Sequence, residues 1–123
     1  MNKKIGEIIR EIRNKKGISL RKLAEIVNVS NVNILYIEKG KINTSLPVLK
    51  GIAKALNYNL DKLLALADMI DDDIRAIINK RPVLITNFLR AAKKLTNNDW
   101  EILTEKILNN ELKLNDSKGI IRA

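Results

Sequence analysis

The chain has 123 residues, which suffices for one domain or for a small domain with an appendage. It has a formal net charge of +9 and contains neither histidine nor cysteine. The commonest general base, the commonest metal ligand and all thiol chemistry are therefore missing, so we expect neither an enzyme nor a cofactor or metal site.

The first predicted element is an amphipathic helix at about residues 3–16. Its apolar residues recur at i, i+3, i+4 and i+7, which places them on one face. They are Ile5, Ile8, Ile9 and Ile12.

Two short helical patterns, separated by a brief turn, come next. Ser19 is suited to cap a helix from about Leu20 to Val27, because its hydroxyl can accept from a backbone N–H of the first turn. Asn28 tolerates the left-handed conformation that a tight turn requires. Ser30 is suited to cap the following helix, and Gly40 to end it. This layout is that of a helix-turn-helix and points to DNA.

The second of these helices has an unusual outer face. If Ile34 and Ile37 face inward, a rotation of about 100° per residue turns a mixed polar and apolar arc outward. Amides, hydroxyls and apolar groups that can touch thymine methyls are what a helix in the major groove needs. The alternative is that the apolar members pack on another part of the protein. The arc comprises Asn31, Val32, Leu35, Tyr36 and Lys39.

A fourth and a fifth helix follow the loop KINTS. Ser45 is suited to cap the fourth helix, and Pro47 fits its first turn. Asn57 and Asn59 separate it from a short fifth helix rich in leucine. These five helices form a compact domain, which we assign to residues 1–67.

Residues 68–123 remain periodic, so about three further helices are predicted rather than a linker. The acidic run Asp71 to Asp73 suits the first turn of a helix better than it suits a cation site. Pro82 opens the next helix, and Thr96 with Asp99 resembles the capping box that opens the last one.

The three C-terminal helices carry more apolar surface than they can bury alone. We expect them to pair with the same helices of a second chain, with Phe88 and Trp100 as anchors. The alternatives are that both aromatic residues lie in the core of one protomer, or that the helices fold back on the N-terminal domain. The last residues, NDSKGIIRA, are expected to form a mobile tail.

The positive charge is concentrated in the first half of the chain. Residues 1–67 hold 13 Lys or Arg and 5 Asp or Glu, a net +8, whereas residues 68–123 hold 10 and 9, a net +1. Such a field favours a phosphate backbone and predicts binding that weakens with salt. Neither a signal peptide nor an apolar run long enough to cross a bilayer is visible, so we expect a cytoplasmic protein without a membrane partner.

Residues 5–66 resemble the Cro/repressor-type helix-turn-helix domain of phage repressors and bacterial xenobiotic-response-element regulators. The segments IREIRNKKGISLRKLAEIVNVS, ILYIEKGK and LPVLKGIAKALN carry the resemblance, which covers about half of the chain. It implies an all-α fold with a five-helix, lambda-repressor-like DNA-binding domain. It also implies that Gly17 to Val27 is the supporting helix and Ser30 to Lys39 the recognition helix.

The resemblance further implies which residues touch DNA. The family's base-contacting positions correspond to Asn31, Val32 and Tyr36, with Asn33 and Leu35 as additional candidates. Replacing Asn31 or Tyr36 by alanine should abolish sequence discrimination, whereas Lys41→Ala should weaken binding to all sequences about equally. The candidate phosphate contacts are Ser19, Arg21, Lys22, Ser30, Lys39, Lys41, Asn43 and Thr44.

Four further positions can be compared with the family pattern. Arg13 and Glu38 occupy the places of a partly buried ion pair that fixes the tilt of the recognition helix, the alternative being two independent solvated charges. The chain departs from the family at Leu20, where glutamine is usual, so one polar anchor is missing. It departs again at Asn28, where glycine is usual, a milder change that keeps the turn.

We therefore expect a sequence-specific regulator that binds double-stranded DNA as a homodimer. Repression by occluding a two-fold operator is favoured, because no segment resembles an effector domain. Two alternatives stay open. The chain could be an antitoxin that binds its own operator and also a toxin partner through the C-terminal helices, or a protein-interaction module that no longer reads DNA.

Overall fold

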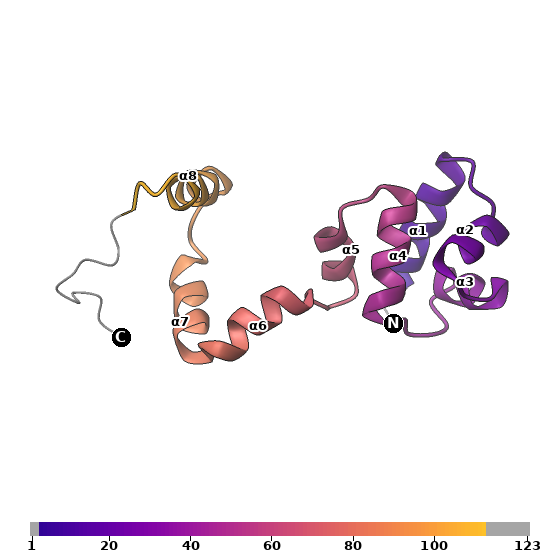
Figure 1. Ribbon diagram of the computed structural model, residues 1–123, viewed down its shortest axis with the longest axis horizontal. Coiled ribbons are helices and arrows are strands. Elements are labelled where there is room, and N and C mark those ends of the chain that lie inside the picture. Colours follow the sequence, from indigo (N-terminus) through magenta and orange to yellow (C-terminus); the bar gives the residue numbers. More distant parts are fainter. Residues whose placement is uncertain (1–2, 113–123) are drawn as a thin grey trace. The chain divides into compact units, whose positions relative to one another are not determined.

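The computed structural model describes residues 3–112, and every regular element in that range is an α-helix (Figure 1). The expected tail, NDSKGIIRA, lies outside the described residues. The predicted all-α fold is confirmed. The helices are α1 (Lys3–Lys15), α2 (Leu20–Val27), α3 (Asn31–Glu38), α4 (Leu46–Leu56), α5 (Leu60–Leu66), α6 (Asp72–Lys80), α7 (Pro82–Ala92) and α8 (Asn97–Leu108).

Two compact units divide the chain, one of residues 1–75 and one of residues 76–123. The division falls inside α6. The first unit thus contains α1 to α5 and the start of α6, and the second contains the rest of α6 with α7 and α8.

Short polar side chains set the ends of the helices. The hydroxyls of Ser19 and Ser30 each accept a hydrogen bond of 3.0 Å from the backbone N–H three residues on, which caps α2 and α3. Asn28 ends α2 in the left-handed conformation, with φ of 63°. Thr96 and Asp99 form the predicted capping box of α8, with reciprocal bonds of 3.1 and 3.0 Å.

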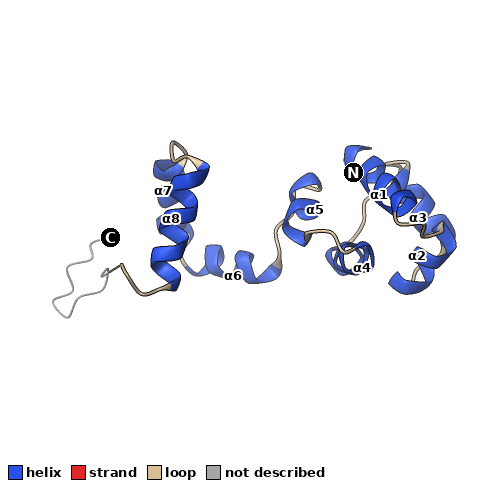
Figure 2. Cartoon of the chain, turned by 90° about the horizontal axis from the view of Figure 1, so that it is seen from above, coloured by secondary structure: helices blue, strands red, loops and turns tan. Residues whose placement is uncertain are grey.

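The core of the first unit is built by α1 to α5, with α1 packed on α3, α2 on α3 and α4, and α5 on α4. In both views α5 lies on the opposite side of the unit from α2 and α3 (Figure 1 and Figure 2). Each fully buried aliphatic side chain contributes roughly 1.5–3 kcal/mol, so this cluster dominates the stability of the unit. Its largest members are Ile5, Ile9, Leu23, Ile34, Ile37, Leu49, Ile52, Leu56, Leu63 and Leu64.

One glycine lets α1 approach the end of α3. A Cβ atom on Gly6 would overlap the backbone carbonyl oxygens of Ile37 and Glu38. Glycine inside a helix costs roughly 0.5–1 kcal/mol relative to alanine, so its presence there has a packing reason. The two helices therefore touch backbone to backbone at the point where α3 ends.

The second unit buries little of its apolar surface. Ala92 is its only buried residue within the described range. The rings of Phe88 and Trp100 meet edge to face, with centroids 6.4 Å apart. Many large apolar side chains of α7 and α8 are exposed, namely Val83, Leu84, Phe88, Leu89, Ile102, Ile107 and Leu108.

Candidate nucleic-acid interface

Helix α3 has one face locked in the core and one face open. Ile34 and Ile37 are fully buried, as their spacing predicts. Asn31, Val32 and Tyr36 lie exposed on the other side. Val32 is 54% and Tyr36 is 40% exposed, although apolar and aromatic side chains are normally covered. The three side chains are thus free to reach base edges in a groove.

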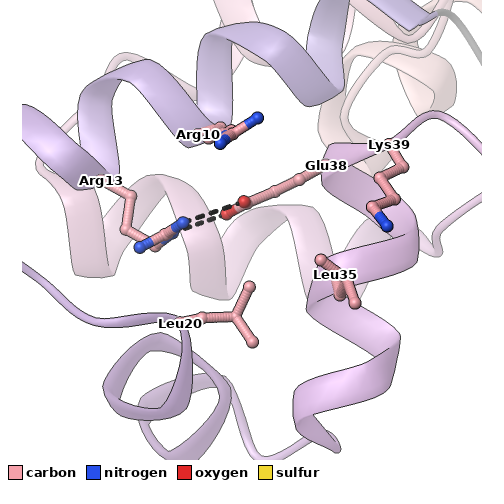
Figure 3. Close-up of a pocket in the computed structure, with 6 residues that line it drawn as sticks. All are labelled: Arg10, Arg13, Leu20, Leu35, Glu38 and Lys39. Carbon is pink, nitrogen blue, oxygen red and sulfur yellow. Dashed lines mark hydrogen bonds and ion pairs between the residues drawn. The ribbon is translucent and has the colours of Figure 1, made fainter.

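The two additional base-contact candidates, Asn33 and Leu35, are less exposed than Asn31, Val32 and Tyr36. Asn33 is half-buried, and its backbone N–H donates to the Ser30 cap. Leu35 is half-buried as well and faces Leu20 at the start of α2 (Figure 3). Leu35 therefore belongs to the contact between α2 and α3 more than to the open face with Val32.

The candidate phosphate contacts gather at two places around the open face of α3. Arg21 and Lys22 are exposed in the first turn of α2, where Ser19 already acts as the cap. Lys39 and Lys41 are exposed at the end of α3. Asn43 and Thr44 follow in the loop, the first exposed and the second half-buried, and Ser30 caps α3 itself.

The structure joins two of the predicted contacts to each other. The Nζ atom of Lys41 lies over the ring of Tyr36, 5.8 Å from its centroid. At this distance the ammonium group is attracted to the ring face. Lys41 thus holds the side chain of Tyr36, which is predicted to contact bases. The sequence alone does not reveal this contact.

Arg13 and Glu38 form a buried, two-pronged ion pair between α1 and α3 (Figure 3). The Nε of Arg13 donates to Oε2 of Glu38 at 2.6 Å, and Nη2 donates to Oε1 at 3.0 Å. Its Nη1 donates to the carbonyl oxygen of Ile18 at 3.0 Å. The hydrogen bond to Glu38 raises the pKa of Arg13, although burial acts in the opposite direction. The guanidinium of Arg13 therefore stays charged, and its hydrogen bonds to Glu38 tie α3 to α1.

A hollow of about 160 Å³ lies beside this ion pair, between α1, α2 and α3 (Figure 3). Leu20 and Leu35 face each other across it, and Arg10 and Lys39 stand at its edge. Arg10 was not predicted to take part in the interface. Its spacing of three residues from Arg13 puts both on the same side of α1, and that is the sequence signal for it.

The acidic run after α5 forms an ion pair rather than a metal site. Asp72 and Asp73 lie in the first turn of α6, as predicted. Asp71 accepts a bond of 2.9 Å from Nζ of Lys50 in α4, which lowers the pKa of Asp71. Across residues 3–112, no three potential ligands come together in an arrangement that could hold a metal ion. None of the helices in that range has the length and apolar character to cross a bilayer.

Comparison with known proteins places the first unit in a family. Residues 9–63 match the helix-turn-helix family HTH_3. An HTH-type transcriptional regulator of Archaeoglobus fulgidus is 38% identical over 60 residues, which span 49% of this chain and 86% of that protein. The competence pilus inhibition repressor of Acinetobacter baylyi is 30% identical over 69 residues, which span 56% of this chain but only 63% of the repressor.

A solved structure shows the same fold. The crystal structure of the clp gene regulator ClgR from Corynebacterium glutamicum matches with a TM-score of 0.50 and 24% identity, over 73% of this chain and 92% of that one. The residues that match the family model, 9–63, include the two helices whose layout first pointed to DNA. Since the match covers most of the archaeal regulator at 38% identity, the chain belongs to the Cro/repressor-type helix-turn-helix family of DNA-binding transcriptional regulators, a family without enzymatic activity.

Proposed function

We propose that the chain is a transcriptional repressor that reads a two-fold operator with α3. One observation carries the proposal: Asn31, Val32 and Tyr36 are exposed on a helix whose opposite face is fixed by Ile34 and Ile37. A rigid helix that presents an amide, an apolar group and a hydroxyl suits the varied edges of the major groove.

The surrounding charges support the same orientation on DNA. Exposed cations border the reading helix, Arg21 and Lys22 at the start of α2 and Lys39 and Lys41 at the end of α3. Contacts to phosphates on either side of a groove set the register of the helix without reading sequence. Binding should therefore weaken as the salt concentration rises.

Selection of bound sequences from a random duplex pool tests the reading face. The wild-type chain should select a symmetric site, and Asn31→Ala or Tyr36→Ala should reduce discrimination at the base pairs that they contact by about 5- to 150-fold, or 1–3 kcal/mol. The matched control is Asn87→Ala, which changes an exposed asparagine of α7. A selected site that is the same for Asn31→Ala, Tyr36→Ala and wild type would remove α3 as the reading element.

The second unit supports a homodimer. With Ala92 as its only buried residue in the described range, the unit leaves the apolar side chains of α7 and α8 uncovered. A second copy would cover them and would supply the second recognition helix that a two-fold operator needs. We place Phe88 and Trp100 in this interface; they touch within one protomer, and Phe88 is still 50% exposed.

Sedimentation velocity tests the dimer. Phe88→Ala with Trp100→Ala should give a monomer, but that pair also removes the contact between α7 and α8. Leu89→Lys tests the surface without that contact. Its control is Asn79→Lys, which adds the same charge at an exposed polar position of α6. We expect a monomer for Leu89→Lys and a dimer for Asn79→Lys.

A wild-type chain that sediments as a monomer would contradict the dimer. The same exposed apolar surface then favours the second candidate, a different protein bound by α7 and α8, as an antitoxin would bind its toxin. Co-purification of a stoichiometric partner that Leu89→Lys fails to retain, and Asn79→Lys retains, would identify it.

A further inference from the structure

We propose that the hollow between α1, α2 and α3 is a seat for one phosphate of the DNA backbone, held by Arg10 and Lys39. The inference rests on the proposed reading of DNA by α3. It adds a contact from α1, an element to which neither the sequence pattern nor the comparisons assign a role in binding.

The two cations at the edge of the hollow are available for a phosphate. Arg10 and Lys39 are both exposed, and neither forms an ion pair within residues 3–112. They come from different helices, yet both line the same hollow (Figure 3). An arginine and a lysine that converge on one small space provide a fork and a point charge for a tetrahedral anion.

The one carboxylate in the hollow is already neutralised. Both oxygens of Glu38 accept hydrogen bonds from Arg13, at 2.6 and 3.0 Å, so this pair contributes no net charge. Glu7 and Glu11 lie near Arg10 on α1 and form no ion pair with it. The hollow itself therefore carries the positive charge of Arg10 and Lys39.

The floor of the hollow suits the sugar next to that phosphate. Leu20 and Leu35 are half-buried and line it with apolar atoms, and its volume of about 160 Å³ exceeds the share of a few water molecules. Leu20 stands where the family usually has a polar anchor. We infer that the cation on α1 replaces that anchor, with Leu20 in contact with the deoxyribose.

The position of the hollow agrees with the proposed path of the DNA. It opens between the first turn of α2 and the last turn of α3, next to Lys39 (Figure 3). The candidate phosphate contacts Arg21 and Lys22 lie in that same first turn of α2. A DNA strand whose phosphates contact Arg21 and Lys22 would also pass the opening of the hollow.

Salt-dependent binding to the selected duplex tests the seat in the full-length chain. Arg10→Gln should lower the slope of log K against log salt by about 0.9 and weaken binding about fivefold at 0.15 M salt, equally for specific and random duplexes. Lys62→Gln, the control, removes the same charge from α5, which packs on α4 and α1 away from α3. Arg10→Lys should restore the slope, because it restores the charge.

Several results would overturn the proposal that Arg10 and Lys39 hold a phosphate in this hollow. One is an Arg10→Gln slope equal to that of Lys62→Gln, and another is a loss of affinity that Arg10→Lys does not recover. Either result leaves the proposed function intact as long as Asn31→Ala and Tyr36→Ala still change the selected sequence. A wild-type chain that binds no duplex would overturn the proposed function and the seat together. Thermal unfolding of each variant shows whether an affinity loss comes from misfolding.

Discussion

At the scale of single residues, the ion pair of Arg13 and Glu38 sets the position of the reading helix. Glu38 lies in the last turn of α3, and Arg13 lies near the end of α1, so their contact holds the two helices at a fixed angle. Both side chains are buried, at 10% and 3% exposure. Removing one partner leaves the other charge without a counter-ion in a place that water reaches poorly.

The first prediction concerns this pair. Glu38→Ala should lower the free energy of unfolding by about 3 kcal/mol in urea denaturation, and operator binding should fall with it, because α3 loses its tie to α1. The double variant Arg13→Met with Glu38→Leu should recover most of that stability, since it leaves no buried charge alone. An unchanged melting temperature for Glu38→Ala would contradict the role of the pair.

Lys41 gives a second prediction. The sequence suggests that Lys41→Ala weakens binding to all DNA equally, but its contact with the Tyr36 ring, 5.8 Å from the centroid, changes that expectation. An exposed contact of this kind is worth about 0.5–1 kcal/mol, so its loss frees the ring. Lys41→Ala should reduce affinity and also discrimination at the Tyr36 base pairs by a few-fold. Lys22→Ala, the control, should reduce affinity alone in the same titrations.

At the scale of the elements, close packing of α1 on the end of α3 depends on a missing side chain. Gly6→Ala would improve the helix propensity of α1 by about 1 kcal/mol, yet its Cβ would strike two backbone carbonyls of α3. Backbone atoms cannot turn aside as a side chain does, so we expect a net loss of about 1–3 kcal/mol in the free energy of unfolding.

Gly51→Ala is the matched control for that third prediction. Its Cβ would meet Cγ1 of Val27 at 3.3 Å, and this side chain can shift by a few tenths of an ångström. Urea denaturation should therefore show a smaller loss for Gly51→Ala than for Gly6→Ala. Equal effects at the two positions would mean that the backbone contact of α1 with α3 adds nothing.

The ion pair between α4 and the start of α6 gives a fourth prediction, about pH. The hydrogen bond from Lys50 and, next, the backbone N–H of Asp72 lower the pKa of Asp71 below its usual value. A lowered pKa means that the contact stabilises the folded chain at neutral pH and is lost as the pH falls through the pKa of Asp71. Both groups are solvated, so the effect on stability is small.

Carboxyl NMR titration checks this assignment. Lys50→Gln should raise the pKa of Asp71 toward its usual value, but not fully, because the bond from the Asp72 N–H remains at 2.8 Å. Lys54→Gln changes a lysine one turn further along α4 and should leave the pKa of Asp71 where it is. A shift of the same size in both variants would point to general charge rather than to the contact.

At the scale of the whole molecule, a fifth prediction follows from the proposed homodimer. Two copies of α3 should read half-sites about 34 Å apart on one side of the duplex. Inserting five base pairs at the centre of the site rotates one half-site by about half a turn, so one α3 loses its contacts. Affinity should fall about 100-fold in a mobility-shift titration, because the second binding event is then no longer intramolecular.

The Leu89→Lys variant is the control for the insertion. A monomer contacts one half-site only, so its weaker binding should not depend on the spacing. Equal sensitivity of wild type and Leu89→Lys to the insertion would contradict dimerisation through α7 and α8.

The sequence by itself determined the parts of this protein that depend on neighbours along the chain. Helix faces follow from apolar residues three and four apart, and helix ends follow from caps such as Ser19, Ser30 and Thr96, because these contacts form within one turn. The inward face of α3 followed in the same way from Ile34 and Ile37. The order of caps, helices and turn from Gly17 to Gly40 then indicated the helix-turn-helix family.

Only the tertiary structure decided which residues from different helices meet. It turned Leu35 toward Leu20, brought Arg10 and Lys39 to the same hollow, set Gly6 against the end of α3 and brought Lys41 over Tyr36. Periodicity cannot supply these facts, because they depend on the distance and angle between packed elements and on the turn after α3. The helix-turn-helix could thus be recognised from local patterns, whereas the details of its DNA-facing surface required the packing of α1, α2 and α3.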